Sequence, residues 1–141
     1  MTFDGAPLLQ PIGSRDWVLM APLVYHTTRG AIEVPAGFIT DLASIPRVFW
    51  PLVPVNGRHR AAAILHDFLY VTQPGTRAEA DALFLEAMHV SGVRWSQRKV
   101  MHAAVRLGGG LAWAANLRAL RADPVAHYRA NGLVHTSAMG A

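Results

Sequence analysis

The chain has 141 residues, a length typical of a single domain, and 52% of them are hydrophobic, which is enough to build a core. Charged residues make up only 16%, so the composition excludes a chain that is disordered over its whole length. Thirteen Lys and Arg against nine Asp and Glu give a net charge of +4, too small a surplus to identify a partner. The absence of cysteine excludes disulfides, thiolate metal sites and a cysteine nucleophile.

The first half of the chain predicts β-structure. Two segments, WVLMAPLVYHT (17–27) and AIEVPAGFIT (31–40), are rich in β-branched and aromatic residues. The TRG sequence at 28–30 between them predicts a hairpin connection. Pro22 and Pro35 indicate strand ends, edges or bulges, because proline cannot donate a ladder hydrogen bond.

The second half predicts three helices. The first covers 58–72 and is ended by the Pro-Gly pair at 74–75. The second follows at once, because Thr76 and Glu79 have the spacing of a capping box. A connection this short predicts that the two helices pack as an antiparallel hairpin.

The third helix is predicted to begin with Ser96 as its N-cap and to run to about Arg121. Three glycines at 108–110 interrupt its pattern, and each costs about 1 kcal/mol relative to alanine inside a helix. They therefore predict a kink, a break or a close backbone contact. The apolar stretch 100–117 contains charged residues, so we do not expect it to span a membrane.

Strands followed by helices favour an α+β fold: an N-terminal antiparallel β-hairpin or small sheet, then three helices. Residues 1–122 are predicted to form this single domain. The segment 123–141 begins with an Asp-Pro pair and has no strong pattern, so we expect a C-terminal arm or tail.

His66 and Asp67 interrupt an apolar run, AAILHDFLYV, where charged groups are unfavourable unless they are paired or bound. On a helix, His66 and Tyr70 share a face, and in the next helix Arg77 and Asp81 are also four residues apart. The antiparallel hairpin would bring the end of the first helix close to the start of the second. The sequence therefore predicts that these groups converge.

Two interpretations of this cluster stay open. In the structural one, Arg77 pairs with an acid and His66 hydrogen-bonds a carboxylate or carbonyl, so that the cluster joins the helices. In the functional one, His66, Asp67 and Asp81 bind a divalent metal, zinc or manganese, with positions open for water. Asp41 is then a further ligand or general base, or simply a turn residue in the loop that contains Ser44.

Several segments together resemble a known family: VPAGFITDLASIPR (34–47), AAILHDFLYV (62–71), RAEADALFLEAM (77–88) and VMHAAVRLGG (100–109). The joint pattern GF-x-TD-x-AS-x-P, HD-x-LY and R-x-x-AD is similar to that of uncharacterised proteins encoded mainly by tailed bacteriophages and prophages. The resemblance implies a phage or prophage origin. Because the N-terminal MTFDGAPLLQPIG has no basic, apolar-centred signal pattern, we expect synthesis in the host cytoplasm, from which assembly into the virion stays open. The resemblance supplies no activity.

Two functional hypotheses follow. The first is a metal-dependent hydrolase acting at the bacterial cell envelope on a cell-wall polymer. Here His66, Asp67 and Asp81 bind the metal, Asp41 is a ligand or base, and Arg77 orients a carboxylate or stabilises an oxyanion. The second is a non-catalytic virion or tail component that contacts other phage proteins. Nucleic-acid binding is not expected, because no recognition motif supports the basic charge.

Overall fold

The structure is a computed structural model, and it describes residues 1–14, 16–41, 51 and 57–133. Its elements in chain order are β1 (Thr2–Phe3), β2 (Leu9–Ile12), β3 (Asp16–Leu19), β4 (Leu23–Thr27), β5 (Gly30–Val34), β6 (Ile39–Thr40), α1 (Arg60–Thr72), α2 (Arg77–Val90), α3 (Trp95–Ala122) and α4 (Pro124–Ala130). The predicted α+β class is confirmed, with strands first and a helical hairpin after them. Much of the predicted loop 41–57, Ser44 included, lies outside the described residues.

The strands form two small antiparallel sheets, with orders β1-β4-β5 and β2-β3-β6. The predicted hairpin is β4–β5, which closes where Thr27 pairs with Gly30. Each of the two long predicted segments is in fact two strands, because the chain turns at Pro22 and again at Pro35. The sequence did not predict β1 and β2, which are short and lack an alternating pattern.

The helices differ from the prediction mainly at their ends. α1 begins at Arg60, and α3 begins at Trp95 with Arg94, rather than Ser96, as its N-cap. α3 also continues without a break through the three glycines at 108–110. Of the outcomes that these glycines predicted, a break is not observed, whereas a close backbone contact is, at Gly109.

The first part of the segment expected as an arm or tail is folded onto the domain. Asp123 accepts a hydrogen bond from the N–H of Ala126 at 3.1 Å, and Pro124 occupies the first turn of α4. The Asp-Pro pair at the start of the expected arm or tail is therefore the start signal of a fourth helix. Leu133, just beyond α4, is buried in the core. Residues 134–141 lie outside the described range.

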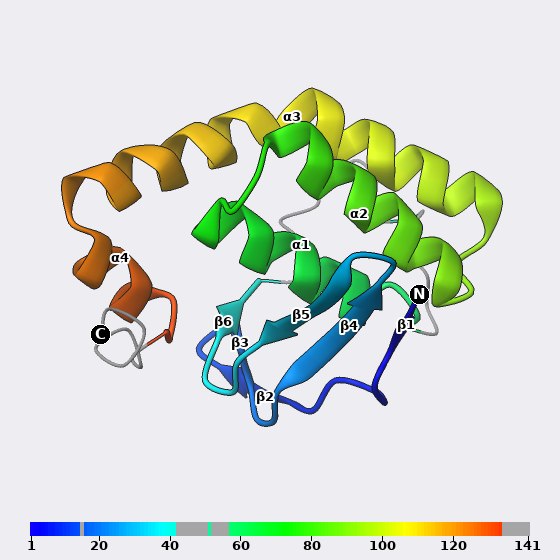
Figure 1. Ribbon diagram of the computed structural model, residues 1–141, viewed down its shortest axis with the longest axis horizontal. Coiled ribbons are helices and arrows are strands. Elements are labelled where there is room, and N and C mark those ends of the chain that lie inside the picture. The colour runs from blue at the N-terminus through cyan, green and yellow to red at the C-terminus, as the bar shows by residue number, and fades with distance from the viewer. Residues whose placement is uncertain (15, 42–50, 52–56, 134–141) are drawn as a thin grey trace.

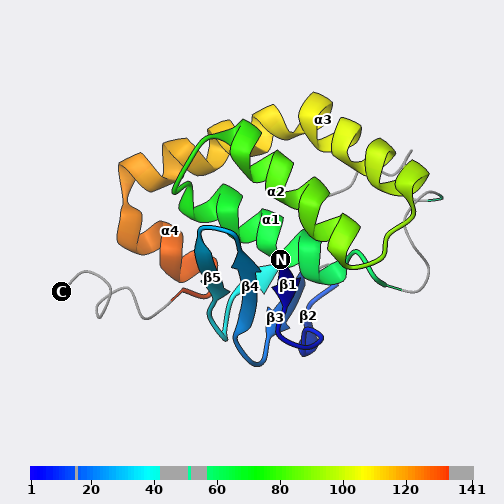
Figure 2. The same cartoon turned by 45° about the vertical axis from the view of Figure 1, so that its right-hand side comes forward.

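The elements are arranged in layers (Figure 1). The strands lie on one side of the α1–α2 hairpin, and α3 crosses its other side, as the turned view in Figure 2 also shows. The core lies between the sheets and the hairpin, where buried strand residues meet buried residues of α1 and α2: Leu19, Leu23, Tyr25, Val34, Phe38, Ile64, Leu65, Phe84 and Met88. No helix in the described part of the chain combines the length and hydrophobicity that crossing a membrane requires.

Candidate functional site

The turn between α1 and α2 is built from local signals. Gln73 caps α1 in the left-handed conformation, with φ of 49°, and the side chain of Thr76 accepts a hydrogen bond from the N–H of Glu79 at 3.1 Å. That bond satisfies one of the free N–H groups at the start of α2. The chain reverses within a few residues, and the reversal places His66 and Tyr70 opposite Asp81.

Asp81 is the centre of a buried polar cluster. Its side chain is 0% exposed. Oδ1 accepts hydrogen bonds from His66 Nε2 at 2.7 Å and from the Tyr70 hydroxyl at 2.8 Å, while Oδ2 accepts one from Arg106 Nη1 at 2.7 Å. Because these donors come from α1 and α3, this carboxylate on α2 joins all three helices. We call His66, Tyr70, Arg77, Asp81 and Arg106 the Asp81 cluster.

Arg77 strengthens the same junction. Its Nη1 lies 3.6 Å from Asp81 Oδ2 and donates to the carbonyl oxygens of Val105 and Arg106, both at 3.2 Å. Those carbonyls belong to α3, whereas Arg77 is the first residue of α2. The guanidinium therefore fixes the start of α2 against the middle of α3.

Both acidic groups of the cluster have shifted pKa values. Burial opposes ionisation of Asp81, but hydrogen bonds from His66, Tyr70 and Arg106 outweigh burial and lower its pKa below the ordinary value. Burial, together with the hydrogen bond to Asp81, raises the pKa of Tyr70 to about 12. At neutral pH the cluster therefore contains a carboxylate and a protonated phenol that donates to it.

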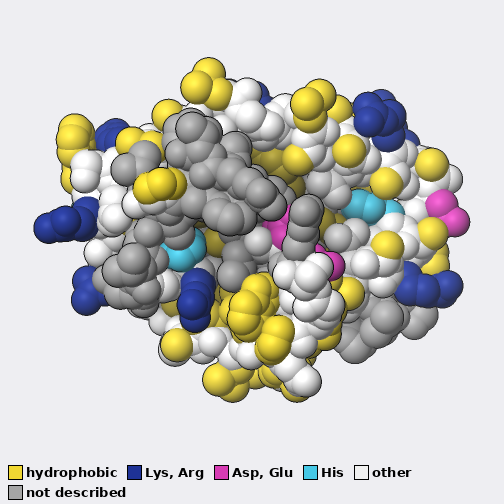
Figure 3. Space-filling model, turned by 180° about the vertical axis from the view of Figure 1, so that it is seen from behind, with side chains coloured by type: hydrophobic (Ala, Val, Ile, Leu, Met, Phe, Trp, Pro, Cys, Tyr) yellow, Lys and Arg dark blue, Asp and Glu magenta, His cyan; other side chains and the backbone are white. Residues whose placement is uncertain are grey.

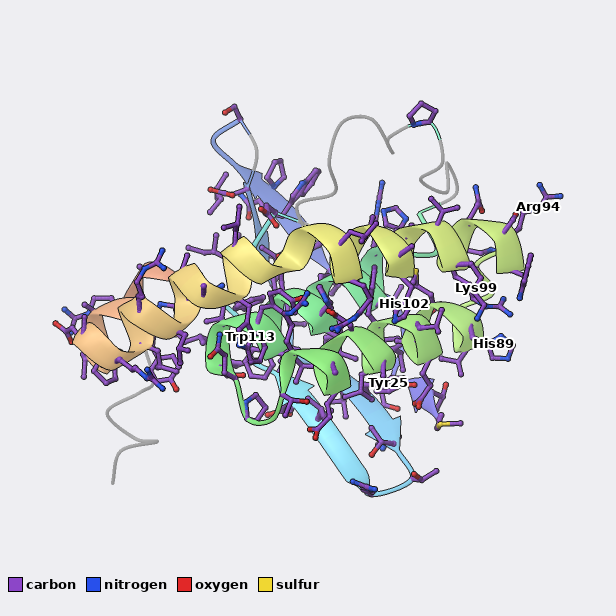
Figure 4. The ribbon with its side chains drawn as sticks, turned by 90° about the horizontal axis from the view of Figure 1, so that it is seen from above. Tyr25, His89, Arg94, Lys99, His102 and Trp113 are labelled. Atoms are coloured by element: carbon purple, nitrogen blue, oxygen red, sulfur yellow. The ribbon has the colours of Figure 1, made fainter. Side chains whose placement is uncertain are left out.

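Gly109 explains how α3 fits over this cluster. A Cβ at position 109 would lie 2.5 Å from the Tyr70 hydroxyl oxygen, so only glycine lets the helix pass this closely. The Tyr70 ring also meets the indole of Trp113 edge-on, with 5.1 Å between ring centroids. Figure 4 shows α3 crossing the hairpin from above, with Trp113 near the end of α1.

A pocket of about 330 Å³ opens beside the cluster. His66 and Tyr70 contribute to its wall, so the cluster forms the back of the pocket. α3 supplies small residues, and other polar side chains come from β3, the end of β6, α1 and the segment after α4. The polar residues that line it are Asp16, Asp41, His66, Asp67, Tyr70, Asn116 and Asn131.

Asp67 faces a different neighbour from Asp81. Its Oδ2 accepts hydrogen bonds from the Thr40 hydroxyl at 2.5 Å and from the backbone N–H of Asp41 at 3.2 Å. These contacts fasten α1 to the end of β6, where Asp41 leaves the sheet. Asp41 and Asp67 also take part in further interactions.

A family profile described as "Protein of unknown function (DUF1353)" matches residues 17–105, more than half of the chain. The chain belongs to the DUF1353 family. "Uncharacterized protein y4jT" of Sinorhizobium fredii (strain NBRC 101917 / NGR234) is similar, with 33% identity over 78 residues. The alignment covers 54% of this chain but only 23% of that protein. No solved structure is a significant match.

All five residues proposed from the sequence lie within the DUF1353 match. Asp41, His66 and Asp67 line the pocket, whereas Arg77 and Asp81 are not among the described residues that do so. His66 belongs to both groups, since its Nε2 meets Asp81 and its ring lines the pocket. Within the described ranges, no three His, Asp or Glu side chains are grouped so as to hold a metal ion.

Arg106 is the cluster residue that sequence reasoning missed, and it lies just beyond the DUF1353 match. The signal was available, because Arg106 stands in the apolar stretch VMHAAVRLGG much as His66 does in its own apolar run. The pocket residues Asp16, Asn116 and Asn131 were also missed. They come from β3, from α3 and from beyond α4, and no local pattern indicates that these segments meet.

Proposed function

We propose that this protein is a hydrolase of phage or prophage origin that acts on a polymer of the bacterial cell envelope. One observation supports the chemistry: Asp81, fully buried, holds His66 Nε2 at 2.7 Å while the same imidazole lines a pocket. A carboxylate behind an imidazole fixes the ring and its tautomer, which is how many hydrolases prepare a general base. The motif pattern described above supports the origin and, through it, the envelope.

In the proposed mechanism His66 moves the proton. An ionised carboxylate only accepts hydrogen bonds, so Nε2 carries the hydrogen and Nδ1 has the free electron pair. Nδ1 takes a proton from water as the water oxygen bonds to a carbonyl carbon of the substrate. The imidazolium then returns that proton to the leaving group when its bond to the carbon breaks. Asp81 stabilises the imidazolium. Arg77 and Arg106 are positioning residues: Arg106 donates a hydrogen bond that favours ionised Asp81, and Arg77 lies 3.6 Å from the same carboxylate.

The metal-dependent form of the hypothesis fits the geometry less well. Both oxygens of Asp81 already accept hydrogen bonds, and the described residues include no grouped set of three ligands. If zinc or manganese does bind, His66 and Asp67 are the candidate ligands, and Asp81 is the carboxylate behind the histidine. Metal analysis of the purified protein decides this: the mechanism above expects no stoichiometric metal and full activity after treatment with EDTA.

The activity test uses purified bacterial sacculi as substrate and the release of soluble fragments as readout. The wild-type protein should release fragments, and His66→Gln should reduce the rate by at least about a hundredfold, as expected for loss of a general base. His89→Gln is the matched control, because His89 is an exposed histidine near the end of α2. A folded wild-type protein that releases nothing refutes the proposal without any reference to the variants.

A non-catalytic role as a virion or tail component has its own support. Leu107 and Leu111, one turn apart on α3, are 87% and 86% exposed, and a component of an assembly would cover such side chains with a neighbour. In that case the Asp81 cluster only joins the helices. Mass spectrometry of purified virions or tails decides between the roles, since only the structural one requires the protein there in fixed copy number.

A further inference from the structure

The polar side chains around the pocket mostly present hydrogen-bond acceptors. Asn116 donates a side-chain N–H to the carbonyl oxygen of Ala112 at 3.0 Å, and Asn131 donates one to the carbonyl of His127 at 2.8 Å. Each asparagine thus uses a donor within its own helix or helix end. Each amide retains its Oδ1 acceptor and the second of its two N–H donors.

The two aromatic polar residues of the wall behave in the same way. The Tyr70 hydroxyl and His66 Nε2 both donate to Asp81. His66 is only 5% exposed, and its Nδ1 has no hydrogen-bond partner among the described residues. An imidazole nitrogen without a proton is an acceptor, so His66, which lines the pocket, favours a ligand that brings a hydrogen.

The charged residues that line the pocket are also hydrogen-bond acceptors. Asp16, Asp41 and Asp67 line the pocket, and no Lys or Arg is among its described lining residues, although the whole chain carries a net charge of +4. Figure 3 shows acidic side chains near the middle of the face seen from behind, with most Lys and Arg side chains toward its edges.

The α3 side of the pocket leaves room for a ligand. Ala104, Gly108 and Ala112 follow one another at intervals of one turn, and all three line the pocket. A Cβ at Gly108 would meet no atom within 4 Å, so internal packing does not explain this glycine. Because these three side chains are no larger than a methyl group, the body of a small ligand can lie against the helix.

We infer that the pocket binds a small ligand, or the end of a polymer unit, through a protonated primary amine. The inference rests on the proposed function only in taking this pocket as the substrate site. Carboxylates and neutral acceptors converge on it, and an ammonium group supplies three donors and a positive charge to match them. A volume of about 330 Å³ suits a group the size of one sugar or amino acid.

The test measures binding, not hydrolysis, with two pairs of probes that differ in the charge of one amine. The first pair is D-glucosamine and N-acetyl-D-glucosamine, and the second is L-lysine amide and its Nε-acetyl form. Titrations followed by protein NMR should show the charged member of at least one pair binding about tenfold or more tightly than the neutral member, as expected for a charged hydrogen bond. The pair whose charged member binds more tightly shows whether the pocket binds an amino sugar or an amino-acid side chain.

Matched variants locate the binding. Asp16→Asn with Asp41→Asn should weaken binding of the responding amine at least about tenfold, because both residues line the pocket. Asp4→Asn removes one carboxylate from a residue outside the described pocket lining, in a surface pair with His26, and should leave binding unchanged. Unchanged backbone NMR signals away from the pocket show that each variant is folded.

Equal binding of both members of each pair, or no binding of any probe, overturns the inference. So does binding that the double variant does not weaken. These results are independent of the sacculus assay: fragment release without preference for amines refutes the ligand class alone. Amine binding without fragment release refutes the hydrolase alone.

Discussion

At the scale of single residues, Asp81 determines whether α1, α2 and α3 stay joined. It is buried in contact with donors from His66, Tyr70 and Arg106, so its charge is compensated only while they remain in place. A buried ion pair often adds little net stability over an apolar pair, but removal of one partner leaves the others without a counter-charge. The main effect of losing the carboxylate is therefore to leave its three donors without an acceptor, rather than to remove the energy of any one hydrogen bond.

We expect Asp81→Asn to lower the free energy of unfolding by about 3–5 kcal/mol, because the arginines and His66 would lose their buried counter-charge. Urea denaturation followed by tryptophan fluorescence measures this change. Asp4→Asn is the control, since Asp4 is 62% exposed in its pair with His26 and such pairs contribute less than about 1 kcal/mol. Equal urea midpoints for Asp81→Asn and the wild type would contradict the role assigned to the cluster.

The same residue predicts how stability depends on pH. Burial acts to raise the pKa of Asp81, yet the hydrogen bonds it accepts lower the pKa below 3.8 in the folded protein. A group with a lowered folded-state pKa stabilises the fold fully above its ordinary pKa and loses that effect as pH falls through the folded-state pKa. Urea unfolding from about pH 5 to about pH 2 should therefore show a steeper loss of stability for the wild type than for Asp81→Asn. Parallel curves would exclude Asp81 as the source.

At the scale of elements, the contact between α3 and α1 depends on Gly109. Alanine there should gain about 1 kcal/mol of helix propensity but lose more, because its Cβ would meet the Tyr70 hydroxyl at 2.5 Å. Tyr70 cannot move aside freely, since it is bonded to Asp81 and packed on Trp113. We expect Gly109→Ala to lower the melting temperature, and Gly110→Ala, whose Cβ would meet no atom within 4 Å, to raise it. The opposite order in calorimetry would show that the contact is not tight.

The elements also show what the sequence reveals and what it does not. The α1–α2 hairpin was predictable because Pro74, Gly75, Thr76 and Glu79 act within one short segment. The approach of Arg106 to Asp81 was not, because it depends on the angle at which α3 crosses the hairpin. The three glycines indicated a special feature in α3, but only the structure shows that Gly109 makes the contact with Tyr70.

At the scale of the whole molecule, the C-terminal segment completes the pocket. Ala130 and Asn131 line it, and the carbonyl of Asn131 accepts a hydrogen bond from the N–H of Ile39 at 2.9 Å. His127 anchors α4 through a hydrogen bond from its Nε2 to the carbonyl oxygen of Val71 at 2.9 Å. Residues from the strands and from the segment after α4 thus meet around one cavity. The stability of the contact between these segments is therefore coupled to the shape of the pocket.

Gly132 tests that coupling. Its φ is +77°, and a Cβ there would overlap the carbonyl oxygen of Gly37, so Gly132→Ala should push the segment away from β6. Gly5→Ala is the matched control, because Gly5 has a similar φ of +72° but open space around its Cβ position. Backbone strain alone costs about 1–2 kcal/mol in both variants, so the excess loss in Gly132→Ala measures the clash. Faster hydrogen exchange at the N–H of Ile39 should accompany that excess. Equal losses of unfolding free energy in the two variants, with unchanged exchange at Ile39, would show that the contact of the C-terminal segment with this part of the pocket wall is not tight.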